Sequence, residues 1–372
     1  MKTGNRGQVL LVFLAALLGL LGIAALGIDI GYLYTVRHEL QRSTDAGALA
    51  GASAFFTGDW DDLATRAVAD ARARDYASRD TVVVSTLNPA SEVQVSFPSR
   101  DRVRVDATRT ANLFFASIFL GPTKTVTAYS VAEASVVNRN VRGLKPWGIP
   151  YPWEDLDNDG FYDLGEPVHR DCPEGITDAS LYFCQGTTVN VKIGVPSGSS
   201  QTSNDLPSTQ QESGHFFCLD FDTSGAMGYR DSIRMESPFL VSAGESVPLE
   251  PGNMVGPTIQ GVTDLIQGDP DSTWNSSTNL PDSPIFSSQG GSEAWMGSPR
   301  MVRIPIYDPE DALLNGKTEM VVATFAGFWI KGIDHHLGTI TGRLVPMRAI
   351  GSGGPSVGPV SGPVLRSLRL VE

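Results

Sequence analysis

The feature that most constrains this chain is an uninterrupted apolar run near its amino terminus, Val9–Ile28. No residue in the run is charged, and none has a side chain that must form a hydrogen bond. At a rise of about 1.5 Å per residue, about twenty helical residues cover the roughly 30 Å hydrocarbon core of a bilayer. Among single chain segments, only a helix satisfies all of its backbone hydrogen bonds internally in lipid. We therefore expect a single membrane-spanning helix here.

The charges on either side of the run predict its orientation. Lys2 and Arg6 precede it, and Asp29 follows it directly. Because basic residues mark the cytoplasmic side of membrane helices, we expect a cytoplasmic amino terminus and an extracytoplasmic domain after Asp29, in the cell membrane. The alternative is a cleaved signal peptide, whose apolar core has roughly 7–15 residues. The run is longer than that, and Ala24–Gly27 is only a loose cleavage match, which favours a retained anchor.

The segment Asp29–Phe56 contains no proline, and we expect the helix to continue through it. Small residues recur in it at helical spacing and form a smooth stripe that lets another backbone approach closely. The stripe consists of Ala46, Gly47, Ala50, Gly51 and Ala54. The sequence leaves open whether it packs on the chain's own downstream domain or on another chain.

This region resembles the amino-terminal segment of TadE/TadG-like proteins, which belong to the Flp (Tad) pilus assembly systems of bacteria. The resemblance rests on Arg6-Gly7, Asp29-Ile30-Gly31, Leu40-Gln41 and the segment 45–51. It implies a membrane-anchored, pilin-like or accessory protein whose partners are pilus-assembly proteins or pilins, reached through the N-terminal helix, with a homo-oligomer as one possible assembly. Processed pilins have a glutamate five residues after the cleaved glycine, whereas Val12 follows Gly7 at that distance. A retained anchor is therefore expected.

Downstream patterns predict an α+β fold. Residues 59–76 have the spacing of an amphipathic helix, and Glu92–Phe97 and Arg102–Asp106 alternate as the half-buried strands of a hairpin do. A short apolar helix over Asn112–Leu120 and a strand over Lys124–Ala132 follow. With a further strand at 81–85, these elements suit a small, pilin-like module.

The composition changes after residue 137, where prolines and glycines become dense and long helical periods are absent. Strand-like runs continue, and two stretches, 196–213 and 269–300, read as long loops. We therefore expect three parts: the anchor and its continuing helix at 1–58, a small α+β module at 59–137, and a β-rich extracytoplasmic domain at 138–372.

The sharpest chemical motif is an acidic loop of the EF-hand type, D-x-D-x-D-G followed by five residues and glutamate. Calcium takes six to eight oxygen ligands at about 2.3–2.6 Å, which alternating acids in a tight coil supply. The expected ligands are the side chains of Asp155, Asp157, Asp159, Asp163 and Glu166 and the carbonyl of Phe161. Prolines border the loop, so flanking helices are not expected, and the alternative is a solvated acidic turn.

The chain has three cysteines, and the expected topology places them in an oxidising compartment. Cys172 and Cys184 close a short loop beside the acidic motif, so we expect a disulfide between them. Cys218 is then left either buried and inert or bonded between chains.

Charge and motifs limit the function classes. A net charge of −13 argues against nucleic-acid binding, which needs clustered lysine and arginine. No catalytic set is visible: Gly354–Gly358 matches a nucleophile-elbow pattern but lies in a glycine- and proline-rich segment. We expect a non-catalytic component of a Tad/Flp-type pilus assembly or secretion apparatus, with calcium stiffening its outer domain. The alternative is a calcium-dependent surface adhesion or binding module not tied to pili.

Overall fold

The computed structural model describes residues 6–58, 62–99, 101–157, 161–173, 176, 182–191, 211–212, 217–221, 225–250, 254–288, 294–311, 319–336, 338–349, 351–353 and 362–371. The chain forms two compact units, Met1–Ala134 with Leu368–Glu372 and Ser135–Ser367. The fold is α+β, with a long apolar N-terminal helix and a β-rich second unit, as the sequence predicts. The three-part boundaries at 58 and 137 remain a prediction.

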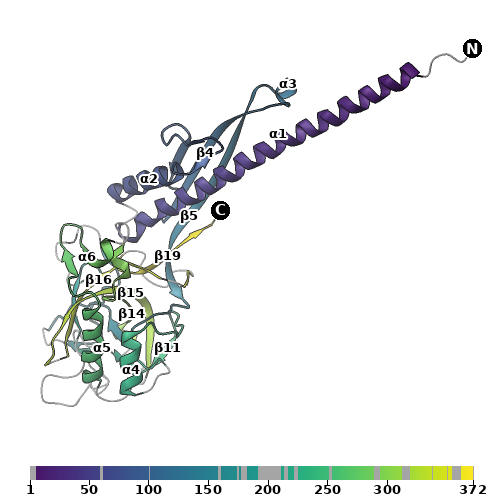
Figure 1. The fold of residues 1–372 in the computed structure, drawn as a ribbon. Coiled ribbons are helices and arrows are strands. Elements are labelled where there is room, and N and C mark those ends of the chain that lie inside the picture. Colours follow the sequence, from purple (N-terminus) through teal and green to yellow (C-terminus); the bar gives the residue numbers. More distant parts are fainter. Residues whose placement is uncertain are drawn as a thin grey trace, which may run out of the picture. The chain divides into compact units, whose positions relative to one another are not determined.

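The first unit is organised around one long helix, α1, Arg6–Ala52, which continues into the 3-10 turn η1, Ser53–Phe56. A second helix, α2, Leu63–Ala77, lies along its carboxyl-terminal half (Figure 1). The side chain of Asp62 starts α2, because it accepts hydrogen bonds from the backbone N–H groups of Ala64 and Thr65.

A strand pair completes this unit. Strand β4, Arg102–Asn112, pairs antiparallel with β5, Thr123–Arg139, from Arg102 opposite Glu133 to Asn112 opposite Thr123. Strand β3, Val93–Ser96, pairs with β4 as the expected hairpin, and β1, Thr81–Val82, pairs with β2, Ser85–Thr86.

The predicted helix over 112–120 is shorter in the structure. Helix α3 covers only Ser117–Leu120, at the tip of the β4–β5 hairpin, because strand pairing continues through Asn112. This tip lies beside α1, well away from α2 (Figure 1).

The interior of the first unit is built largely from alanine. Small side chains let the two helices and the sheet approach closely, at the expense of buried apolar area. The core includes Val36, Leu40, Ala48, Ala52, Phe55, Ala69, Ala73, Ala77, Val103, Val105, Ala107 and Ala132.

The second unit contains a seven-stranded sheet. Its main order is β10 (Phe217–Cys218), β6 (Trp147–Pro150), β14 (Met301–Tyr307), β15 (Glu319–Ile333), β16 (Ile340–Val345) and β8 (Thr188–Val191), and β11 (Ser246–Pro248) pairs with the start of β15. The pairing is antiparallel except between β14 and β6. Strand β15 runs without a break through Glu319–Ile333.

Two helices of this unit were not expected from the sequence. Helix α4, Ala226–Arg234, and α5, Val255–Gln267, lie side by side (Figure 1). A Cβ atom on Gly261 would lie 2.7 Å from the Ile233 side chain, so glycine permits this close contact. Gly256, Pro257 and Gly261 hide the helical pattern, because glycine and proline are poor helix formers.

The stretch predicted as a loop at 269–300 holds several short elements. They are β12 (Thr273–Asn275), β13 (Leu280–Asp282), α6 (Pro284–Ser287) and η4 (Ala294–Gly297). Buried Asp269 organises them by accepting hydrogen bonds from Ser283 and Ser298 at 2.8 and 2.5 Å. Of the other predicted loop, 196–210 and 213 lie outside the described residues.

The remaining strands are short, and the last of them returns the chain to the first unit. They are β7 (Phe161–Tyr162), which pairs with β9 (Gln211–Glu212), then β17 (Met347–Arg348), β18 (Ser352–Gly353) and β19 (Leu365–Leu370). Arg369 then donates a hydrogen bond at 2.6 Å to Glu133, a buried carboxylate that also pairs with Arg102 at 2.9 Å.

Candidate functional site

The amino-terminal half of α1 is exposed along its whole apolar run. In its most apolar window none of the residues is buried, and Leu10, Leu20 and Ile23 are 67, 67 and 76% exposed. By length and composition, α1 is the one helix among the described residues that could cross a membrane. An isolated apolar helix this exposed is out of place in water, since burial of each large side chain is worth about 1.5–3 kcal/mol. A membrane anchor accounts for it.

The carboxyl-terminal half of α1 is packed inside the first unit. Burial of apolar side chains begins at Val36 and Leu40, which are 1 and 0% exposed, and recurs every three or four residues. This spacing places one face of the helix against α2 and β4. One continuous helix therefore has an exposed apolar half and a half packed within the first unit.

The small-residue stripe lies at the contact between α1 and α2. A Cβ atom on Gly47 would be 2.8 Å from the carbonyl oxygen of Ala73, and one on Gly51 would be 2.9 Å from Val103 Cγ1. Ala54 is buried, whereas Ala46 and Ala50 are only partly buried. The sequence left open whether this stripe packs on the chain's own downstream elements or on another chain. In the structure, Gly47 and Gly51 pack on the chain's own elements.

A polar cluster ties α1 to β5 within the first unit. Gln41 donates to Ser130 Oγ at 2.7 Å and to the carbonyl oxygen of Tyr129 at 3.0 Å. Ser130 in turn donates to the carboxylate of Asp45, and its hydroxyl lies 3.2 Å from that of Thr44. Gln41 and Asp45 were noted in the sequence only for their resemblance to a family, and the geometry now gives them a positioning role.

Asp29 binds the tip of the β4–β5 hairpin. Its carboxylate accepts the backbone N–H groups of Phe114 and Phe115, both at 2.8 Å, and of Ala116. The side chain is 1% exposed. The sequence showed Asp29 only as the charge that ends the apolar run, because no local pattern indicates a contact 85 residues away in the chain.

The acidic loop brings part of the predicted calcium set together. Oxygens of Asp155, Asp157 and Glu166 lie within 4.8 Å of one another. Asp163 is not part of this cluster, although its N–H donates to Glu166 at 3.0 Å, and the second Glu166 oxygen accepts from Leu156 N–H at 2.8 Å. Glu166 therefore closes the loop through backbone contacts.

Two of the predicted ligands are described in part or not at all. Asp159 lies outside the described residues, and of Phe161 only the backbone is described, in β7. The carboxylates that are described supply the hard oxygen donors that calcium prefers.

The structure joins Cys172 to Cys184 by a disulfide. Cys218 is unpaired and fully buried on β10. Burial raises the pKa of the Cys218 thiol to about 12, and the nearby Glu250 charge acts in the same direction. Since the thiolate is the reactive form, Cys218 is chemically inert at neutral pH.

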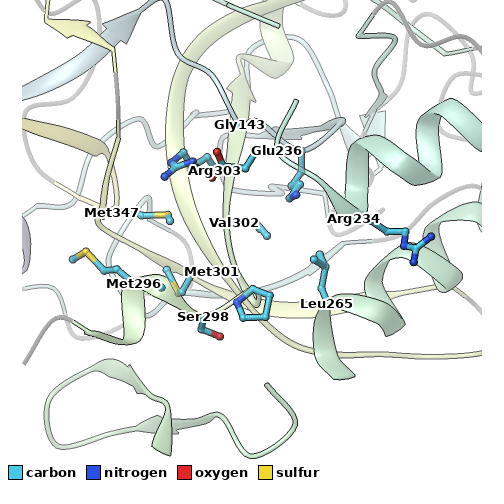
Figure 2. A pocket seen from close by; sticks show the side chains of 13 residues that line it. Gly143, Arg234, Glu236, Leu265, Met296, Ser298, Met301, Val302, Arg303 and Met347 are labelled. Carbon is cyan, nitrogen blue, oxygen red and sulfur yellow. Dashed lines mark hydrogen bonds and ion pairs between the residues drawn. The ribbon is translucent and has the colours of Figure 1, made fainter. Parts of the chain in front are cut away.

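A pocket of about 300 Å³ opens in the second unit, and no sequence pattern indicated it because its residues come from separate segments. Met296, Met301 and Met347 gather on one side of it, and Arg234 lies on the other (Figure 2). Lys145 also lines it, and its Nζ donates to the carbonyl oxygen of Met235 at 2.9 Å.

Burial lowers the pKa of Lys145 to about 8. The positive charge of Arg303 acts in the same direction, and the negative charge of Glu236 opposes it. Arg303 and Glu236 also pair with each other at 3.0 Å.

Together, the exposed apolar half of α1, its packed second half and the β-rich unit define an α+β protein whose N-terminal helix is long and apolar enough to cross a membrane. Residues 7–54 match the model of a family described as putative Flp pilus-assembly TadE/G-like, which confirms the resemblance seen in the sequence. The matched segment is almost the whole of α1. No curated protein and no solved structure matches the chain.

Proposed function

We propose that this protein is a membrane-anchored, non-catalytic component of a Tad/Flp-type pilus assembly or secretion apparatus. The observation that carries the proposal is the coincidence of the family match, residues 7–54, with α1. The matched residues include Asp29, Gln41, Asp45 and both stripe glycines, each of which makes a contact that shapes the first unit.

The exposed half of α1 supports lateral contacts in the membrane. A Cβ atom added to Gly19 or to Gly22 would have nothing within 4 Å, so this half of the helix is open to other membrane helices. Small residues favour close helix approach in lipid. The partners are therefore other pilus-assembly proteins or pilins, reached through residues 10–28.

The charges beside the apolar run support the orientation. With Arg6 before the run and Asp29 after it, the amino terminus is cytoplasmic, and the part of the first unit after Asp29 and the whole second unit are extracytoplasmic. The Cys172–Cys184 disulfide suits that compartment. Protease treatment of intact cells tests this: cleavage of the second unit is expected, and protection in both intact cells and spheroplasts would reverse the orientation.

We further propose that calcium binds the acidic loop and stiffens the second unit. The proximity of Asp155, Asp157 and Glu166 supports this, because carboxylates within 4.8 Å of one another offer the oxygen ligands that calcium prefers. Extracellular calcium modules commonly bind at about 10⁻⁴–10⁻³ M. Such an affinity suits a structural clamp rather than a sensor.

Site-specific photocrosslinking in native membranes tests the assignment to the apparatus. Photoreactive residues at Leu14 and Leu18, both exposed in the anchor, are expected to capture pilus-assembly proteins. The control position is Thr108, which is exposed on β4. Crosslinks to unrelated membrane proteins alone, at the same yield with and without the pilus genes, would refute the assignment. Calcium-dependent surface adhesion would then be the function to test.

A further inference from the structure

The tip of the β4–β5 hairpin exposes an apolar surface. Phe114, Phe115 and Leu120 are 60, 48 and 69% exposed, although they are among the largest apolar side chains of the first unit. The segment 112–124 contains no acidic residue, and its single charge is Lys124. Exposed apolar clusters of this kind mark an interaction surface for protein or membrane.

Asp29 fixes the position of this tip along α1. Its carboxylate accepts three consecutive backbone N–H groups, from Phe114 to Ala116, and the ring of Phe114 contacts that of Tyr32 edge-on at 5.4 Å. Moving the tip along the helix would leave a buried carboxylate without partners, which is strongly unfavourable. The tip is therefore held at the level of Asp29.

The level of Asp29 is the end of the apolar run. Its neighbours Ile28 and Ile30 are 55 and 58% exposed, and Tyr34 is 72% exposed. At about 1.5 Å per residue, Tyr34 lies about 7.5 Å further along the helix, within the interfacial layer of a bilayer whose core ends near Asp29. Tyrosine is enriched in that layer.

We propose that the hairpin tip, Leu113–Leu120, enters the headgroup and acyl boundary of the membrane that α1 spans. The partner is phospholipid, and the inference rests on the proposed role of α1 as a membrane anchor. The exposed apolar side chains of the tip lie at the level of the exposed Ile28 and Ile30 of α1, and Lys124 is suited to a lipid phosphate. The first unit is then held to the membrane at two points.

Spin labels on the full-length protein in phosphatidylcholine vesicles test this. Labels are introduced by Leu120→Cys at the tip, by Leu14→Cys in the anchor and by Thr127→Cys at an exposed position on β5. The native cysteines do not interfere, because two form the disulfide and Cys218 is buried. The measurement is the accessibility of each label to oxygen, which concentrates in lipid, relative to a water-soluble nickel chelate.

The expected ratio of oxygen to nickel accessibility at position 120 is several-fold higher than at 127 and approaches that at 14. If position 14 is in lipid but position 120 behaves as 127 does, the tip is in water and the inference fails while the anchor stands. If position 14 is itself in water, the anchor fails and the inference with it. Dipolar broadening between labels at 120, present even at high dilution in lipid, would identify a second copy as the partner and overturn the lipid assignment.

A further variant tests the positioning role of Asp29. Asp29→Asn keeps the size of the side chain but replaces one acceptor oxygen by a donor NH₂ group, which cannot accept the N–H groups that it faces, either that of Phe114 or those of Phe115 and Ala116. The label at position 120 is then expected to become more mobile and more accessible to nickel. An unchanged spectrum would show that Asp29 does not set the depth of the tip.

Discussion

Replacing Gly47 by alanine tests how closely α1 and α2 pack. A Cβ atom at this position would lie 2.8 Å from the carbonyl oxygen of Ala73 and 2.9 Å from the Cβ of Ala77. Neither atom is the end of a flexible side chain, so the backbones of the two helices must separate. Overpacking of this kind typically costs about 1–3 kcal/mol.

The matched control is Gly31→Ala, the same substitution in the same helix. A Cβ atom on Gly31 would have nothing within 4 Å. Alanine is favoured over glycine in a helix by about 1 kcal/mol, and this gain is common to both variants. The difference between them therefore isolates the overpacking, and Gly47→Ala is expected to be about 1–3 kcal/mol less stable than Gly31→Ala.

Denaturant unfolding of the full-length protein in detergent micelles, followed by far-UV circular dichroism, measures both values. Adding Ala77→Gly to Gly47→Ala removes one of the two close contacts and is expected to restore part of the loss, beyond the cost of a glycine in α2. If Gly47→Ala is as stable as Gly31→Ala, α1 and α2 do not approach as described, and the stripe is free for another chain.

Three further predictions concern the second unit. With 5 mM calcium, we expect a gain in unfolding free energy of about 1–2 kcal/mol, measured by calorimetry. Asp157→Ala should abolish this gain, and Asp271→Ala, which lies outside the loop, should retain it. Equal gains in both variants would exclude the acidic loop as the calcium site. The pKa of Lys145 is about 8 in the folded state, below its unfolded value, so the folded state binds fewer protons than the unfolded state between about pH 8 and 10. The free energy of unfolding is therefore expected to rise with pH in this range, by up to about 1.4 kcal/mol per pH unit relative to Lys145→Met. Parallel pH profiles of the two proteins would contradict this. Replacing Cys172 and Cys184 by serine opens a loop with a sequence separation of 12 and is expected to cost about 3 kcal/mol in denaturant unfolding, whereas no loss would mean that the disulfide constrains little.

Residue periodicity predicted the elements whose environment is uniform along their length. The amphipathic helix near 63–77 and the β3–β4 hairpin follow directly from spacing, because each has one buried surface, and the helix over the apolar run follows from its length and composition. Helix α5 was missed, since Gly261 is required by its contact with Ile233 rather than by any helical preference.

The parts of the site that sequence missed depend on contacts between distant residues. The acidic loop could be singled out because its predicted ligands lie within twelve residues and form a local motif, and calcium binding there stays a prediction. The role of Asp29 was not found, because its three partners lie on a hairpin more than eighty residues away. The pocket around Lys145 was missed for the same reason, since residues from separate strands and helices line it.

The path of the chain between the units has a consequence for synthesis. The chain leaves the first unit along β5 and returns to it along β19, so the second unit is inserted between parts of the first. The returning residues complete the first unit through two hydrogen bonds: Arg369 donates to the Glu133 carboxylate, and the N–H of Val371 donates to the carbonyl oxygen of Val131. A ribosome must therefore translate all of Ser135–Ser367 before the anchor-bearing unit can close. A chain truncated before Leu368 would carry the whole of α1 but lack the residues that complete the first unit.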